Sequence, residues 1–480
     1  MSIESIVRRV LLGSLTLVLA VGSSHAQATG EPDWAVVEAE TMRHFQALVR
    51  MDTQSPPGNE KPAADYVADV LRREGIAVQT FALEPNRPNV VARIKGNGGK
   101  RPLLIMGHTD TVNVDVKKWI HPPFGAVREG GHVYGRGTLD DKDSVTAGLM
   151  VMLLLKRAGI ALDRDVIFLA EAGEEGDTRV GIEFMVNQHF AEIDAEYCYA
   201  ETGEATREGG RVRYATVQTT EKLPRGIELV ARGPAGHGSV PLKTNALALL
   251  SVAVAKVAAW RPPVDLNDTT ALYFKRLAAL SPPDVARRYT DVFSPDPKIS
   301  GPADDYLLEH EPRHASMLRT SLSPTLLQAG YRVNVIPSEA TATFDVRVMP
   351  DENLDRFLEQ VRSVVGDPAV EVRWSKRSTR PPGASRLNTE AYKVIEAAVT
   401  RRYETPTLPT MSTGATDMAF LRAKGVECYG VGPGIDVEDG PKGFGSHSDQ
   451  ERILESELHR YVRFYWEITT NLARAGRGAR

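Results

Sequence analysis

The chain has 480 residues, of which 42% are hydrophobic and 25% are charged. This composition is typical of a globular protein and excludes a fibrous, collagen-like or wholly disordered chain. The formal net charge is −4, so no basic excess indicates a nucleic-acid partner. We expect about two domains, because one hydrophobic core rarely grows beyond roughly 300 residues. Cys198 and Cys428 lie in apolar stretches, which predicts buried free thiols or at most one disulfide.

Residues 1–26 have the parts of a secretory signal peptide. Arg8 and Arg9 form a positive region, and the apolar run of residues 10–21 follows it. This run is too short to cross a hydrocarbon core about 30 Å thick, which disfavours a membrane anchor. We therefore expect cleavage after Ala26 and a periplasmic or secreted mature chain without a membrane partner.

The next segments alternate between the periodicities of helices and strands. Apolar residues at helical spacing predict helices over residues 31–50, 63–74 and 147–158. Short apolar runs bounded by polar or glycine residues predict strands over residues 78–83, 90–94, 103–106 and 165–170. This alternation predicts an α/β sheet with helices on both faces.

The pattern changes near residue 218. Strand, helix, two strands, helix and strand are predicted, in this order, over residues 226–232, 245–257, 331–336, 340–348, 351–365 and 370–374. A βαββαβ order is typical of a ferredoxin-like α+β sandwich. We therefore expect an inserted domain over residues 218–376, between the two parts of a catalytic domain at 31–217 and 377–480. Residues 262–328 are rich in Pro, Asp and Arg and match no predicted element.

Acidic residues and histidines follow the predicted strands or lie in loops of the larger domain. They are, in chain order, His108, Asp110, Asp140, Glu174, Glu175, Glu201 and His447. Ligand sites of open α/β sheets lie beyond the carboxyl ends of the strands, where so many carboxylates would repel one another without a cation. Histidine and carboxylate ligands without a thiolate favour zinc, or failing that manganese or cobalt. Their number suits the two-metal arrangement of hydrolases.

Short blocks in this order resemble the co-catalytic dizinc peptidases, which include glutamate carboxypeptidase, succinyl-diaminopimelate desuccinylase, aminoacylase and carboxypeptidase S. The blocks are GHTDTV, GRGTLDDKDS, EEGD, AET, GPAGHGSVP, RVNVIPSEATATFDVR, STGATD and SHSDQE. The resemblance covers about residues 40–465, nearly the whole mature chain. It implies a zinc-peptidase α/β catalytic domain with an inserted ferredoxin-like lid or dimerisation domain.

The resemblance also implies a metal ligand set. His108 and Glu201 would hold one Zn²⁺, Glu175 and His447 would hold the other, and Asp140 would bridge both. Co²⁺ or Mn²⁺ could take the place of zinc. In the family, the peptide bond after this bridging aspartate is typically cis.

Further roles follow from the same resemblance. Asp110 would accept a hydrogen bond from the imidazole of His108 and thereby fix its tautomer. Glu174 would act as the general base, taking a proton from a metal-bridging water and passing it to the leaving amine. His237 matches the histidine that stabilises the tetrahedral oxyanion, and in dimeric members it reaches in from the partner subunit. A plainer interpretation of His237, between two glycines, is a turn histidine.

Three residues match positions that contact the substrate. Asn334 and Arg347 correspond to residues that grip it, and Gly414 lies in a loop that lines the pocket. The planar guanidinium of Arg347 suits a terminal carboxylate, because it can bind both oxygens. Arg347 could instead form an ordinary surface ion pair.

We therefore expect an exported metal-dependent hydrolase of the carboxypeptidase or dipeptidase type. Its substrate would be a peptide or an N-acyl amino acid with a free carboxylate. The alternatives are an aminoacylase specific for N-acyl amino acids and a non-catalytic peptide-binding relative. Segment 262–328 resembles the enlarged insertion of the carboxypeptidase S-like branch. Because it lies in the domain that usually dimerises, it leaves a homodimer as one of the open oligomeric states.

Overall fold

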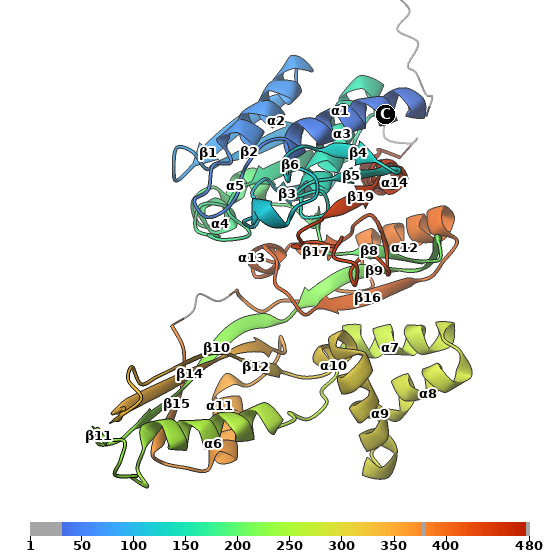
Figure 1. Ribbon diagram of the computed structural model, residues 1–480. Helices are drawn as coiled ribbons and strands as arrows, with labels where there is room; N and C mark the ends of the chain where they lie inside the picture. Colours follow the sequence, from blue (N-terminus) through green and yellow to red (C-terminus); the bar gives the residue numbers. More distant parts are fainter. Residues whose placement is uncertain (1–30, 377–379, 477–480) are drawn as a thin grey trace, which may run out of the picture.

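The computed structural model describes residues 31–376 and 380–476, so the predicted signal peptide 1–26 lies outside the described residues. The molecule has a larger unit built on a ten-stranded sheet and a smaller unit built on a four-stranded sheet (Figure 1). No helix among the described residues combines the length and the apolar character needed to cross a membrane.

The larger sheet has the strand order β1-β2-β6-β3-β7-β17-β9-β8-β18, and β16 pairs with β9. The strands are β1 (Ala77–Ala82), β2 (Pro88–Ile94), β3 (Leu103–His108), β6 (Val166–Glu171), β7 (Tyr197–Ala200), β8 (Glu204–Glu208), β9 (Arg211–Glu221), β16 (Thr407–Ser412), β17 (Glu427–Gly430) and β18 (Gly434–Asp436). β3 runs parallel to both β6 and β7. Every residue of these three strands is buried, as expected for parallel strands covered on both faces.

Helices cover both faces of this sheet. One face shares a core with α1 (Trp34–Val49), α2 (Lys61–Arg73), α3 (Lys142–Ala158), α12 (Glu390–Tyr403) and α14 (Glu455–Ala473). The other face packs against the short helices α4 (Ile182–Gln188), α5 (Phe190–Ile193) and α13 (Met418–Arg422). Helix α3 approaches the sheet closely at Gly148, where a Cβ atom would lie 2.4 Å from the ring of Phe168.

The smaller unit has the strand order β12-β14-β10-β15, and all its pairs are antiparallel. Its elements are β10 (Leu223–Arg232), α6 (Ala246–Ala259), β12 (Ser321–Ala329), β14 (Glu339–Val348), α11 (Leu354–Val365) and β15 (Val370–Trp374). Both helices share one core with the sheet. The chain therefore follows the βαββαβ order that the sequence predicts.

The second strand of this unit differs from the prediction. The strand expected over residues 331–336 lies instead at β12, which begins inside the segment that the sequence left unassigned. Only β13 (Val335–Ile336) is extended in the expected range, paired with β11 (Gly236–His237). Pro324 obscures β12 in the sequence because proline is depleted in strands, yet an edge strand tolerates it. Most of β12 is exposed, so it also lacks the alternation of a half-buried strand.

The rest of the unassigned segment forms a helical cluster. Its helices are α7 (Asp268–Leu280), α8 (Pro283–Asp291), α9 (Pro297–His310) and α10 (Pro312–Met317). Their shared core includes Leu408 and Met411 of β16. The cluster thus interrupts the smaller unit in sequence, but in space it joins the edge of the larger sheet (Figure 1).

Candidate metal centre

Three parallel strands bring acidic and histidine side chains to one edge of the larger sheet. His108 is the last residue of β3, Glu201 directly follows β7, and Glu175 lies in the loop after β6. Asp140 lies at the turn into α3. Because this helix is buried, it fixes the position of the Asp140 carboxylate. Because parallel strands end at the same edge, the side chains of His108, Glu175 and Glu201 meet there, and the turn into α3 adds Asp140.

His447 reaches the same place from a different part of the chain. Its loop precedes β19 (Arg452–Leu454), which pairs with β5 (His132–Tyr134). His447 has a left-handed backbone conformation with a φ of 62°. Non-glycine residues seldom adopt this conformation outside turns and functional sites.

The five predicted ligands form two overlapping groups. The potential ligand atoms of His108, Asp140 and Glu201 lie within 4.8 Å of one another, and so do those of Asp140, Glu175 and His447. Asp140 Oδ1 lies 3.0 Å from His108 Nε2, while its Oδ2 lies 3.1 Å from His447 Nε2. Glu175 Oε1 lies 2.9 Å from the same nitrogen of His447. One carboxylate is therefore shared by two three-ligand sets, which suits a bridged pair of metals.

The protonation of this cluster fits a site for cations. Burial raises the pKa of Glu201 well above its ordinary value, and the charges of Glu174 and Asp140 raise it further. Hydrogen bonds to Asp140 and Glu175 raise the pKa of His447 to about 10. Bound protons thus neutralise part of the charge of carboxylates that would otherwise repel one another. Divalent zinc, cobalt or manganese could replace these protons, since all three accept histidine and carboxylate ligands.

Asp110 is fully buried and connects two parts of the site. Its Oδ1 atom lies 3.4 Å from Nδ1 of His108, and its backbone oxygen lies 3.1 Å from the same nitrogen. Its carboxylate also accepts hydrogen bonds from the backbone N–H groups of Glu174 and Glu175, both at 3.1 Å. One aspartate therefore orients an imidazole and fixes the loop that carries two glutamates.

The peptide bond between Asp140 and Asp141 is cis, as the resemblance implies. The Asp141 carboxylate accepts a hydrogen bond from the backbone N–H of His108 at 3.1 Å. The turn into α3 is therefore joined directly to the end of β3.

Glu174 lies beside these ligands and contacts a residue that the sequence did not indicate. Its Oε1 atom accepts a hydrogen bond of 2.6 Å from Nη2 of Arg380. Burial raises the pKa of Glu174 well above its ordinary value, whereas the charge of Arg380 opposes this shift. The same Arg380 nitrogen lies 3.1 Å from Oδ1 of Asp417. Asp417 belongs to the quoted STGATD block, whereas no motif marks Arg380.

The structure does not bring His237 and Asn334 to this cluster. The two residues lie together where β11 pairs with β13, and the N–H of Gly238 donates to the backbone oxygen of Asn334. Both are exposed, and Nδ1 of His237 lies 2.7 Å from Oγ of Ser239. Figure 1 shows β11 at the end of the smaller unit that points away from the larger sheet.

The other two residues predicted to contact the substrate, Arg347 and Gly414, lie on different elements of the structure. Arg347 lies on β14, where its Nε donates a hydrogen bond of 2.8 Å to Asp345. Gly414 is exposed in the loop after β16, and its N–H donates to Oγ of Ser412.

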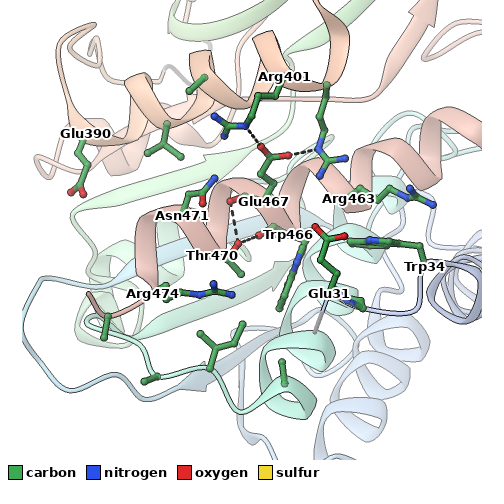
Figure 2. A pocket seen from close by; sticks show the side chains of 18 of the residues that line it. Glu31, Trp34, Glu390, Arg401, Arg463, Trp466, Glu467, Thr470, Asn471 and Arg474 are labelled. Atoms are coloured by element: carbon green, nitrogen blue, oxygen red, sulfur yellow. Dashed lines mark hydrogen bonds and ion pairs between the residues drawn. The ribbon is translucent and has the colours of Figure 1, made fainter. Parts of the chain in front are cut away.

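A large groove of about 1230 Å³ lies elsewhere, between α12, α14 and the start of α1 (Figure 2). Trp34 and Trp466 line it, and Glu467 forms ion pairs with Arg401 and Arg402. None of the predicted site residues lines this groove. The chemistry of the side chains, rather than the size of a cavity, therefore locates the candidate site at the edge of the sheet.

Comparison with known proteins gives a consistent result. The model of peptidase family M20/M25/M40 matches residues 104–471. The probable carboxypeptidase S-like 2 of Dictyostelium discoideum is 28% identical over 380 residues, which cover 77% of this chain and 72% of that protein. The N-fatty-acyl-amino acid synthase/hydrolase PM20D1 of Homo sapiens is 26% identical over 387 residues, covering 77% of this chain and 74% of that protein.

A solved structure has the same fold. An M20 family metallo-carboxypeptidase from Sulfolobus solfataricus aligns with a TM-score of 0.66 at 18% sequence identity. The alignment covers 89% of this chain and 98% of that one. The two-unit mixed α/β architecture is therefore that of M20 peptidase structures.

We expect metal binding to release protons. Because the pKa of His447 is about 10, this imidazole is protonated at neutral pH in the metal-free protein and must lose its proton to bind a metal. For each proton released, the apparent Zn²⁺ affinity should fall about tenfold per unit as the pH drops from about 8 to about 6. Calorimetric titration of chelator-treated protein, in buffers with different ionisation enthalpies, counts these protons.

The variant His447→Ala provides the comparison for this titration. It should bind less metal and release fewer protons. Zinc binding without any proton release in the unaltered chain would contradict the ligand assignment.

Proposed function

Since this chain belongs to peptidase family M20/M25/M40, we propose that it is an exported dizinc hydrolase that cleaves an amide bond next to a free carboxylate. As a family member it is a metal-dependent hydrolase of the carboxypeptidase, dipeptidase or aminoacylase type. The observation that carries the finer proposal is the position of Asp140 between two three-ligand sets, with Glu174 beside them.

The chain's own residues would hold the two metals. His108, Asp140 and Glu201 would form one site, and Asp140 would form the other with Glu175 and His447. When bound, such ions supply Lewis acidity, which activates water and polarises a scissile carbonyl.

Glu174 is the residue best placed to move a proton. It directly precedes the ligand Glu175, and Asp110 fixes the backbone of both. With Oε1 engaged by Arg380, the second oxygen of Glu174 can accept a proton from the attacking water. The same oxygen can then deliver this proton to the leaving amine.

The smaller unit would recognise the substrate. The guanidinium of Arg347 is suited to the free carboxylate of the leaving amino acid. Asn334 would hold the same end of the substrate, and His237 would donate a hydrogen bond to the oxyanion that forms at the carbonyl. Gly414, exposed in its loop, would line the pocket.

We expect Glu174→Gln to lower kcat by at least about 10²-fold, because proton transfer by a side chain contributes 10²–10⁴-fold. The variant should keep its metal content, since Glu174 belongs to neither ligand set. The assay is hydrolysis of dipeptides and N-acyl amino acids that share one C-terminal residue, each also offered with an amidated C-terminus. The control is Glu467→Gln, whose side chain lies in the groove of Figure 2.

The preferred substrate in this panel distinguishes peptidase activity from aminoacylase activity. Turnover of N-acyl amino acids alone would favour the aminoacylase alternative. Equal turnover of amidated substrates would contradict the recognition of a free carboxylate. A metal-loaded chain that hydrolyses no member would support the non-catalytic, peptide-binding alternative.

We also propose a homodimer in which His237 and Asn334 of each subunit serve the metal cluster of the partner. Their exposure at the far end of the smaller unit supports this arrangement, because in one chain they lie away from the cluster. The exposed Leu326 and Leu327 on the edge strand β12 provide apolar surface for such an association.

Heterodimers of two inactive variants test this proposal. We expect a purified heterodimer of His237→Ala and Glu174→Gln to recover about half of the wild-type activity, because one of its two sites would be complete. A heterodimer of Glu174→Gln and His447→Ala is the control. It should stay inactive, because each change damages the metal cluster of its own subunit and neither site would be complete. An inactive first heterodimer, or a monomer in light scattering, would contradict the proposal.

Export is supported by residues 1–26 of the sequence alone. If the protein is exported, mass spectrometry of the chain recovered from bacterial periplasm or medium should find Gln27 as the first residue. Recovery of the uncleaved chain from the cytoplasm would contradict export.

A further inference from the structure

Arg380 is a largely buried cation between two carboxylates. Its side chain is 17% exposed, while those of Glu174 and Asp417 are 9% and 1% exposed. One nitrogen, Nη2, makes both contacts, at 2.6 Å to Glu174 and 3.1 Å to Asp417. A guanidinium taken out of water needs partners that compensate for its lost hydration, and carboxylates serve this purpose.

The backbone near Arg380 is anchored to the larger sheet. The N–H of Ser385 donates to the backbone oxygen of Thr219, and Oγ1 of Thr220 donates to the backbone oxygen of Gly383. Both threonines lie near the end of β9. The chain is therefore held to β9 a few residues after Arg380.

Asp417 is the second carboxylate that the same Arg380 nitrogen contacts. It is the residue that precedes α13, and α13 packs in the core under the sheet. Glu174, in contrast, lies in a loop whose backbone is held by Asp110 but whose carboxylate accepts its described side-chain hydrogen bond from Arg380. Arg380 thus links the Glu174 carboxylate to the residue that precedes α13.

We propose that Arg380 is a positioning residue for the reaction, and that it holds the Glu174 carboxylate in the orientation needed for proton transfer. By engaging Oε1 it leaves the second oxygen free for water and for the leaving amine. The inference rests on the proposed role of Glu174 as general base. A carboxylate displaced by about 1 Å can cost 10²-fold in rate, so this orientation matters.

The plainer alternative is that Arg380 only neutralises buried acids. Arg380→Lys separates the two roles, because lysine keeps the charge but is shorter, so its ammonium would not reach both carboxylates in the same geometry. If Arg380 positions Glu174, we expect kcat of this variant to fall by about 10–10²-fold with a KM changed less than about threefold. Its metal content and thermal unfolding should stay near those of the wild type.

Chemical rescue provides a second measurement. Guanidinium added at sub-denaturing concentration should restore part of the activity of Arg380→Ala by occupying the vacated position. Asp417→Asn serves if the arginine variants do not fold, and it should lower kcat in the same direction. The matched control is Arg164→Lys, since Arg164 is also buried between carboxylates, those of Glu196 and Glu390, and makes no contact with Glu174.

Wild-type kcat in Arg380→Lys, or a folded and metal-loaded Arg380→Ala that guanidinium does not rescue, would overturn the inference. An inactive wild type would instead overturn the proposed function. In that case, crystal structures of metal-loaded wild type and Arg380→Lys still decide the matter. The inference requires one ordered Glu174 rotamer in the wild type and a displaced or disordered carboxylate in the variant.

Discussion

The structure depends on how it compensates the negative charge collected at one edge of the larger sheet. β3, β6 and β7 are buried on both faces, so the carboxylates that follow them enter a region where like charges repel strongly. Two imidazoles and one guanidinium contact these carboxylates, and the two groups that share Asp140 could bind divalent ions that would compensate the remaining charge. The fold therefore collects carboxylates at this edge together with the cationic groups that compensate their charge.

The compensating groups come from distant parts of the chain, and the fold must hold all of them at once. Helix α3 holds Asp140 through its burial, and the small sheet around β19 delivers His447. Arg380 arrives on the segment that returns from the smaller unit. Asp110 then joins the His108 imidazole to the loop of Glu174 and Glu175, so the proposed metal binding and proton transfer would share one support.

Much of this could be predicted from the sequence, because periodicity and local motifs report local structure. Helices α1 and α2 and strand β15 lie where the sequence predicts them, and the five predicted ligand residues lie together in two groups that could hold metal ions. β12 escaped prediction because Pro324 interrupts it and exposure removes its alternation. Arg380 escaped because its partners are 206 and 37 residues away, and no spacing rule reports such contacts.

The helical cluster α7–α10 has a mechanical consequence. Because it leaves the smaller unit after α6 and returns to it before β12, the chain passes between the two units at four places rather than two. Two adjacent connections form a simple hinge, whereas four separate ones restrict the axes about which a body can rotate. Any large swing of the smaller unit would have to bend all four or pull the cluster from β16. We therefore expect the insertion to restrict rotation of the smaller unit relative to the larger sheet.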